Sequence, residues 1–157
     1  MNVLVQCEGI LTKGGKRIPQ NVVTISTLSS YANVIVVCDD KRRIEADLED
    51  TERQTKPWYS GCPLNSDCSF TEESLEKLLL ELNPEDVLIT NLRAEASLLN
   101  MFGCTVFWIN PSMKGHITHT KIYAVPELRQ VPSLIQRLKG ARTYLEKQYG
   151  VNPLDYI

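Results

Sequence analysis

The sequence predicts an α/β fold in which a mainly parallel sheet is covered by helices on both faces. Short, continuous apolar runs alternate with segments of helical periodicity, and several of these runs end abruptly in polar residues. Continuous apolar strands are typical of parallel sheets that are buried on both faces. Their alternation with helices predicts βαβ units in a Rossmann-like, doubly wound arrangement. A length of 157 residues suits one such domain, spanning residues 1–157.

Six apolar runs are predicted to be strands. One of them lies in the least regular part of the chain, residues 51–70, where Pro, Gly, Asn and Ser are frequent. We interpret that part as a small insert. The six predicted strands are Val3–Gln6, Val34–Val37, Trp58–Tyr59, Val87–Ile89, Thr105–Ile109 and Lys121–Ala124.

The predicted helices follow from apolar spacing and from their start and stop residues. Pro19 opens a segment in which Val22, Ile25 and Leu28 fall on one face. Thr71 opens the clearest helix, with acidic residues in its first turn, and Asn83-Pro84 ends it. The remaining predicted helices cover 41–48, 94–99 and a final segment from Glu127 or Pro132 to Tyr149.

Composition excludes several classes of protein. Hydrophobic residues make up 43% and charged residues 23%, as in an ordinary globular protein. The net charge of −2 supplies no broad basic surface, so we expect no nucleic acid as a partner. No apolar run approaches the roughly 20 residues of a membrane helix, and no export signal is visible. We therefore expect a cytoplasmic protein with reduced cysteines, of which the three in or at the ends of apolar strand runs, Cys7, Cys38 and Cys104, act as small apolar side chains.

Polar residues follow three of the predicted strands. They are the segments 6–8 (Gln-Cys-Glu), 38–40 (Cys-Asp-Asp) and 90–91 (Thr-Asn). Ligands of parallel sheets bind at the carboxyl ends of the strands. These segments are therefore the candidate site.

The first two strand ends resemble known motifs. Residues 5–12, VQCEGILT, resemble the first motif, DxDGTLT, of the haloacid dehalogenase (HAD) superfamily. The resemblance places Gln6 at the position of the nucleophilic Asp and Glu8 at that of the acid/base. The strand that ends at Cys38 is similar to the second motif, with Cys38 at the position of its Ser or Thr hydroxyl.

The third strand end resembles the fourth motif of the same superfamily, a strand followed by GDxxxD. Residues 86–95, DVLITNLRAE, place Asn91 and Glu95 at its two acids. The resemblance covers residues 2–111 and depends on the order of the motifs along the chain.

The resemblance implies a HAD-like fold without a large cap. The gap between Gln6 and Cys38 leaves no room for a large cap, and the superfamily's squiggle-and-flap turn is expected at residues 7–20. Candidates for the lysine of the third motif are Lys56 and Lys77.

Two neutral amides stand where this resemblance requires carboxylates. An amide oxygen is too weak a nucleophile to attack phosphorus, so Gln6 cannot replace the nucleophilic Asp. Mg²⁺ prefers charged oxygen ligands, and Asn91 offers none. We therefore predict a noncatalytic HAD-like domain, a pseudoenzyme that acts as a binding or scaffold protein and needs no cofactor. Its expected partner is a protein or a second copy of the chain, or else a small phosphorylated ligand in the old cleft.

Two other functions remain open on the sequence alone. One is a divergent Mg²⁺-dependent phosphatase or nucleotidase, a phosphoric monoester hydrolase whose relocated metal ligands would be Glu8, Asp39 and Glu95. The other is a nucleotide-binding or self-associating Rossmann-like protein outside the superfamily.

The remaining conspicuous residues have structural explanations. His116 and His119 are predicted to lie in a loop or strand, and two histidines alone make a weak zinc site. The Gly/Lys-rich segment 13–16 is expected to be an exposed turn, since it lacks the phosphate-binding loop pattern. We assign Trp108 to the core, whereas Trp58–Tyr59 could belong to the core or to a binding surface.

Overall fold

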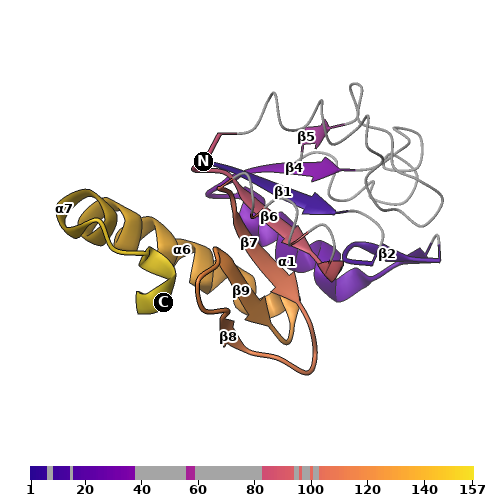
Figure 1. Cartoon of the computed structure of the whole chain (residues 1–157). Coiled ribbons are helices and arrows are strands. Elements are labelled where there is room, and N and C mark those ends of the chain that lie inside the picture. Colours follow the sequence, from indigo (N-terminus) through magenta and orange to yellow (C-terminus); the bar gives the residue numbers. More distant parts are fainter. Residues whose placement is uncertain are drawn as a thin grey trace.

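The computed structural model is an α/β structure built on a seven-stranded sheet (Figure 1). It describes residues 1–6, 9–14, 16–37, 56–58, 83–93, 96, 100 and 103–157. The strand order is β5-β4-β1-β6-β7-β9-β8, and every neighbouring pair is parallel except β8 and β9. The strands are β1 (Asn2–Gln6), β4 (Asn33–Val37), β5 (Lys56–Trp58), β6 (Val87–Thr90), β7 (Thr105–Ile109), β8 (Gly115–His116) and β9 (Ile122–Val125).

The predicted strands are confirmed, with one displacement and three additions. The third predicted strand, Trp58–Tyr59, lies two residues earlier, at Lys56–Trp58. The sequence did not indicate β8, nor a hairpin of β2 (Thr12–Lys13) and β3 (Lys16–Arg17). Each of these three strands has only two residues, which is too short for a strand periodicity to be recognised.

Strand β1 is buried on both faces at the centre of the sheet. Val3 and Val5 on one face are 0% exposed, and Leu4 on the other is 4% exposed. Its two neighbours, β4 and β6, both run parallel to it. Burial on both faces explains why these strands read as continuous apolar runs. The prediction of a Rossmann-like α/β fold is thereby confirmed.

The described helices pack together on one face of the sheet. Helix α1 (Pro19–Ser29) and helix α6 (Val131–Ala141) share a core cluster with Val3, Val5 and Phe107. The apolar stripe predicted for α1 is buried as expected. The final predicted helix is also confirmed, as a continuous run of η1 (Leu128–Gln130, 3₁₀), α6, η2 (Arg142–Glu146, a π-helix) and α7 (Lys147–Tyr149), and the chain closes with η3 (Pro153–Tyr156, 3₁₀).

Several predictions fall outside the described residues. They are the helices at 41–48 and 71–82, most of the helix at 94–99, and, apart from β5, the insert at 51–70. The segment that could hold a small cap lies there too. Among the helices that are described, none is long and apolar enough to cross a lipid bilayer.

Asp86 joins the amino ends of the two central strands. Its carboxylate is 3% exposed and accepts two backbone hydrogen bonds, one per oxygen. Asn2 N donates to Oδ1 at 2.8 Å, and Asn83 N donates to Oδ2 at 3.0 Å. Asp86 thus links the start of β1 to the turn that precedes β6. Burial, with Asp86 adding to the effect, raises the pKa of the adjacent Cys104 thiol, in keeping with its predicted apolar role.

We expect Asp86→Asn to lower the free energy of unfolding by about 1–3 kcal/mol. An amide has a single acceptor oxygen, so one of the two buried backbone N–H groups would face an NH₂ group. The matched control is Glu85→Gln, an isosteric change at the exposed neighbouring residue, which should change stability by less than about 0.5 kcal/mol. Urea unfolding followed by circular dichroism measures both, and equal effects would contradict the role of Asp86.

Candidate functional site

The candidate site lies where the strand order reverses. The chain passes from β1 outward through β4 to β5, then returns to the other side of β1 as β6. Open α/β sheets bind their ligands at this switch point, outside the carboxyl ends of the strands. The register pairs Gln6 with Val37 and Val5 with Ile89, so Gln6 and Thr90 end neighbouring strands. The structure therefore brings Gln6 close to Asn91, which directly follows β6.

The amide of Gln6 is buried and bonded at the end of β1. Its side chain is 1% exposed, and its Oε1 accepts a hydrogen bond from the hydroxyl of Thr90. The same hydroxyl oxygen accepts a hydrogen bond from Leu92 N at 3.1 Å. Thr90 thus links the amide to the backbone that leaves β6. The oxygen of Gln6 is held inside the sheet and is not presented to solvent.

The turn after β1 is tight and leads into the hairpin. Gly9 N donates to Thr12 O at 2.6 Å, and Ile18 N donates to Leu11 O at 2.8 Å. Asn21 connects α1 to the turn, because its Nδ2 donates a hydrogen bond to Ile10 O at 2.7 Å. The β2–β3 hairpin follows, at the place where the resemblance implies a flap. Its Lys13 and Lys16 are exposed, as predicted for the Gly/Lys-rich turn.

Gly9 packs directly against the side chain of Asn91. A Cβ atom at Gly9 would lie 2.7 Å from Asn91 Oδ1 and 2.8 Å from its Cγ, too close for any real contact. The φ angle of Gly9 is +92°, which favours glycine in any case. The positive φ angle therefore favours glycine at this turn, and a side chain at position 9 would force the amide of Asn91 to move.

A small recess of about 430 Å³ opens beside this contact. It is lined by Gly9, Asn91, Trp108 and Asn110, among others. The guanidinium carbon of Arg93 lies 5.1 Å from the centre of the Trp108 ring, which is a cation–π arrangement. The prediction that Trp108 belongs to the core is wrong. Its strand end emerges at the carboxyl edge, so the ring is only half-buried and lines the recess.

Arg93 and Asn110 are residues of this edge that the sequence did not reveal. Arg93 is two residues beyond Asn91, and Asn110 directly follows β7. The position of Asn110 after a predicted strand was a usable signal. Nothing in the sequence indicated that Arg93 would stack on a residue of the next strand.

The described donors of this site do not suit Mg²⁺. Gln6 and Asn91 are neutral, and Oε1 of Gln6 is already engaged by Thr90. Across the part of the chain that the structure describes, no group of three His, Cys, Asp or Glu residues could hold a metal ion. The other predicted residues of the site, Glu8, Cys38, Asp39 and Glu95, lie outside that part, as do Cys7 and Lys77.

The two histidines lie in a different part of the molecule, where His116 links neighbouring elements through its ring nitrogens. Both ring nitrogens of His116 face acceptors, with Nδ1 2.7 Å from Asp155 Oδ1 and Nε2 2.6 Å from Thr120 O. His116 thus connects β8 to η3 and to the turn before β9. His119 is exposed and takes a positive φ of 63° in that turn.

Gly9→Ala should destabilise the protein more than Gly103→Ala. The two glycines have similar φ angles, +92° and +85°, but nothing lies within 4 Å of a Cβ built at Gly103. Backbone strain of about 1–3 kcal/mol is therefore common to both, and the clash with Asn91 is specific to Gly9. We expect Asn91→Ala to remove the difference in a double-mutant cycle measured by urea unfolding. Equal costs for the two glycines would show that the close contact is absent.

Comparison with known proteins identifies the fold and not the family. No family model matches the chain, and no curated protein matches it in sequence. Among solved structures, it is similar to YfnB of Bacillus subtilis, which is described as a HAD-hydrolase and was crystallised bound to magnesium, with a TM-score of 0.53 at 15% identity. The match covers 78% of this chain and 57% of YfnB, so the chain spans just over half the length of that protein. The chain therefore has a HAD-like α/β fold.

Proposed function

We propose that this chain is a noncatalytic HAD-like domain that acts as a binding or scaffold protein. The observation that carries the proposal is the state of Gln6. At the strand end where the resemblance requires a nucleophilic carboxylate, an amide is buried and bonded to Thr90. A carboxylate in the same place would need a metal, a cation or additional hydrogen-bond donors beside it, because burying a charge costs more than burying a bonded amide.

Asn91 supports the same conclusion at the neighbouring strand. Its side chain is packed against Gly9 and carries no charge that could hold Mg²⁺. Phosphotransfer requires a nucleophile and a metal ligand. The carboxylates for both are absent at the two positions that the resemblance assigns to them.

The carboxyl edge offers features suited to a protein partner. Arg93 is exposed and stacks on the half-buried ring of Trp108, beside a recess lined by Asn91 and Asn110. Trp and Arg are enriched among the residues that contribute most to binding at protein interfaces. The amides can donate and accept hydrogen bonds at the rim of such an interface. We propose that the Arg93–Trp108 pair is the centre of the partner surface, with a second copy of the chain as the first partner to test.

The catalytic part is tested by hydrolysis of p-nitrophenyl phosphate with and without Mg²⁺. We expect no Mg²⁺-dependent turnover, because Gln6 cannot form an aspartyl-phosphate. Turnover that requires Mg²⁺ and disappears in Glu8→Ala would contradict the proposal and favour a divergent phosphatase. Glu85→Gln, a change at an exposed acid at the opposite edge, is the control for unspecific effects of charge.

The binding part is tested by sedimentation velocity over a range of concentrations. If the chain self-associates through this edge, Arg93→Glu should weaken the association about tenfold, since hot-spot residues contribute at least that much. Arg137→Glu, at an exposed position of α6, is the matched control and should leave it unchanged. Equal effects of the two variants would place the interface elsewhere. A monomer at every concentration would exclude self-association and require a different protein as the partner.

A further inference from the structure

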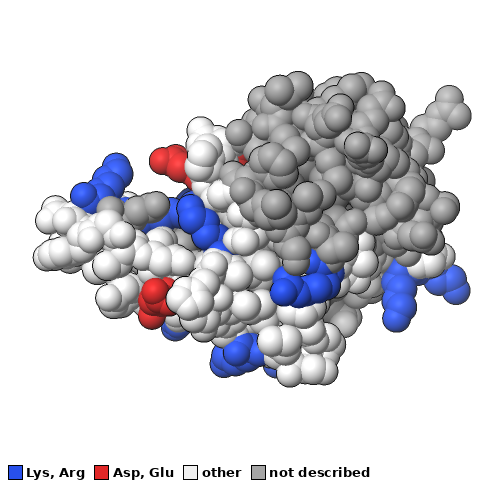
Figure 2. All heavy atoms as spheres, in the orientation of Figure 1, with Lys and Arg blue, Asp and Glu red and all other residues white. Residues whose placement is uncertain are grey.

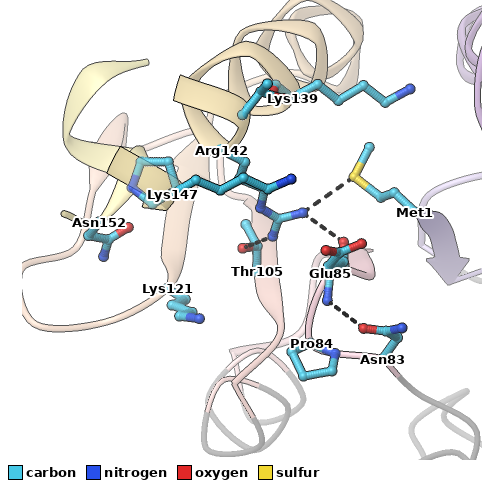
Figure 3. Close-up of a pocket in the computed structure, with 12 residues that line it drawn as sticks. Met1, Asn83, Pro84, Glu85, Thr105, Lys121, Lys139, Arg142, Lys147 and Asn152 are labelled. Carbon is cyan, nitrogen blue, oxygen red and sulfur yellow. Dashed lines mark hydrogen bonds between the residues drawn. The ribbon is translucent and has the colours of Figure 1, made fainter. Parts of the chain in front are cut away.

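A sizeable pocket lies at the edge of the sheet opposite the candidate site. It has a volume of about 700 Å³, within the range of small-molecule sites. Residues at the amino ends of the central strands form one wall, and the helical run that ends in α7 forms the other (Figure 3). Figure 2 shows Lys and Arg atoms in the hollow between these helices and the sheet. None of the lining residues belongs to the carboxyl edge of the sheet.

The pocket is strongly basic for a protein with a net charge of −2. Its described lining residues include the four cations Lys121, Lys139, Arg142 and Lys147 and one acidic residue, Glu85. Lys121 directly precedes β9, whereas Lys139, Arg142 and Lys147 belong to α6, η2 and α7 in turn. The fold therefore concentrates positive charge here that the composition does not reveal.

Arg142 is held rigidly at the centre of the pocket. Its guanidinium donates to Glu85 O at 2.7 Å and to Thr105 Oγ1, also at 2.7 Å (Figure 3). Thr105 is buried, and Glu85 O belongs to the turn that Asp86 fixes. The guanidinium is thus positioned by the sheet before any ligand arrives, which reduces the cost of binding.

The hydrogen bonds that the structure gives the lysines around Arg142 go to neutral groups. Lys121 Nζ donates to Gly103 O and Lys139 Nζ to Tyr31 O, both at 3.2 Å, and both acceptors are neutral carbonyls. Within the described part of the chain, no carboxylate lies at ion-pair distance from Lys121, Lys139 or Lys147. Each ammonium has three N–H donors, so those with one bond retain two for a ligand.

A change in helix type occurs at two of the cations that line the pocket. The α-helical hydrogen bonding of α6 gives way at Arg142 to the π-helix η2, which ends just before Lys147. Arg142 opens the π-helical turn and Lys147 directly follows it, and both residues line the pocket. Single-turn π-helices are frequent at functional sites. Here the irregular turn places both side chains on the pocket.

We propose that this basic pocket binds a small molecule carrying a diphosphate or a comparable pair of phosphate groups. The Arg142 guanidinium supplies a fixed positive charge, and the lysines around it supply N–H donors and further positive charge for phosphate oxygens. A pocket of this volume is too confined for a nucleic acid duplex. This inference does not depend on the function proposed for the carboxyl edge, since the two sites share no residue.

Isothermal titration with inorganic pyrophosphate and with ADP tests the proposal on the full chain. We expect saturable binding of one equivalent of pyrophosphate, and tighter binding of ADP if the pocket also receives an organic group. Lys147→Gln changes an exposed side chain and should weaken pyrophosphate binding about tenfold, as loss of one charge-assisted contact predicts. Lys121→Gln should have a similar effect from the other wall of the pocket.

The matched control is Lys114→Gln, which removes an exposed lysine in the loop that follows β7, at the opposite edge. It should leave pyrophosphate binding unchanged. Absence of saturable binding to the wild-type protein would overturn the proposal. It would also be overturned if Lys114→Gln weakened binding as much as Lys147→Gln, because the attraction would then be one of net charge alone. Neither result bears on the Mg²⁺ and sedimentation tests of the carboxyl edge.

Discussion

Burial of β1 on both faces, between two parallel partners, is the constraint on which the rest of the structure depends. A strand in this position must be apolar throughout, and every polar group at its end must find a partner inside the protein. The end of β1 is Gln6, and its partner is the hydroxyl of Thr90 on the neighbouring strand. The pairing of β1 with β6 therefore decides both the position and the chemistry of the candidate site.

An amide at the end of β1 needs no charged partner, because its oxygen is satisfied by the hydroxyl of Thr90. The charge of a buried carboxylate must be stabilised, as two backbone N–H groups do for Asp86, whereas a buried amide is neutral and needs only ordinary hydrogen bonds. Gly9 closes the turn above it against Asn91, another neutral side chain. Around the contact of Gly9 with Asn91, the described residues include amides, the Trp108 ring and the stacked Arg93. At the amino edge, described lysines and Arg142 surround a separate pocket.

Most of the fold could be predicted from the sequence because its elements follow simple periodicities. The apolar runs at Val3–Gln6, Val87–Ile89 and Thr105–Ile109 are strands because nothing else buries so many consecutive β-branched and aromatic residues in so short a segment. The stripe of Val22, Ile25 and Leu28 likewise defines the buried face of α1. The two-residue strands were missed because they are too short to show a strand periodicity, although Gly14-Gly15 between β2 and β3 is a usable hairpin signal.

The sequence by itself determined the α/β architecture and the order of the polar strand ends, including the amides at Gln6 and Asn91. Only the tertiary structure decided which of these groups meet. In the structure, Trp108 lines the recess, and Arg93 stacks on its ring. A second set of residues, far from the recess, lines one pocket: Lys121, Lys139, Arg142 and Lys147. The physical reason is the same in each case. Local periodicity reports which residues of one element are buried, but contacts between side chains of different strands and helices depend on register, twist and packing that no local pattern records.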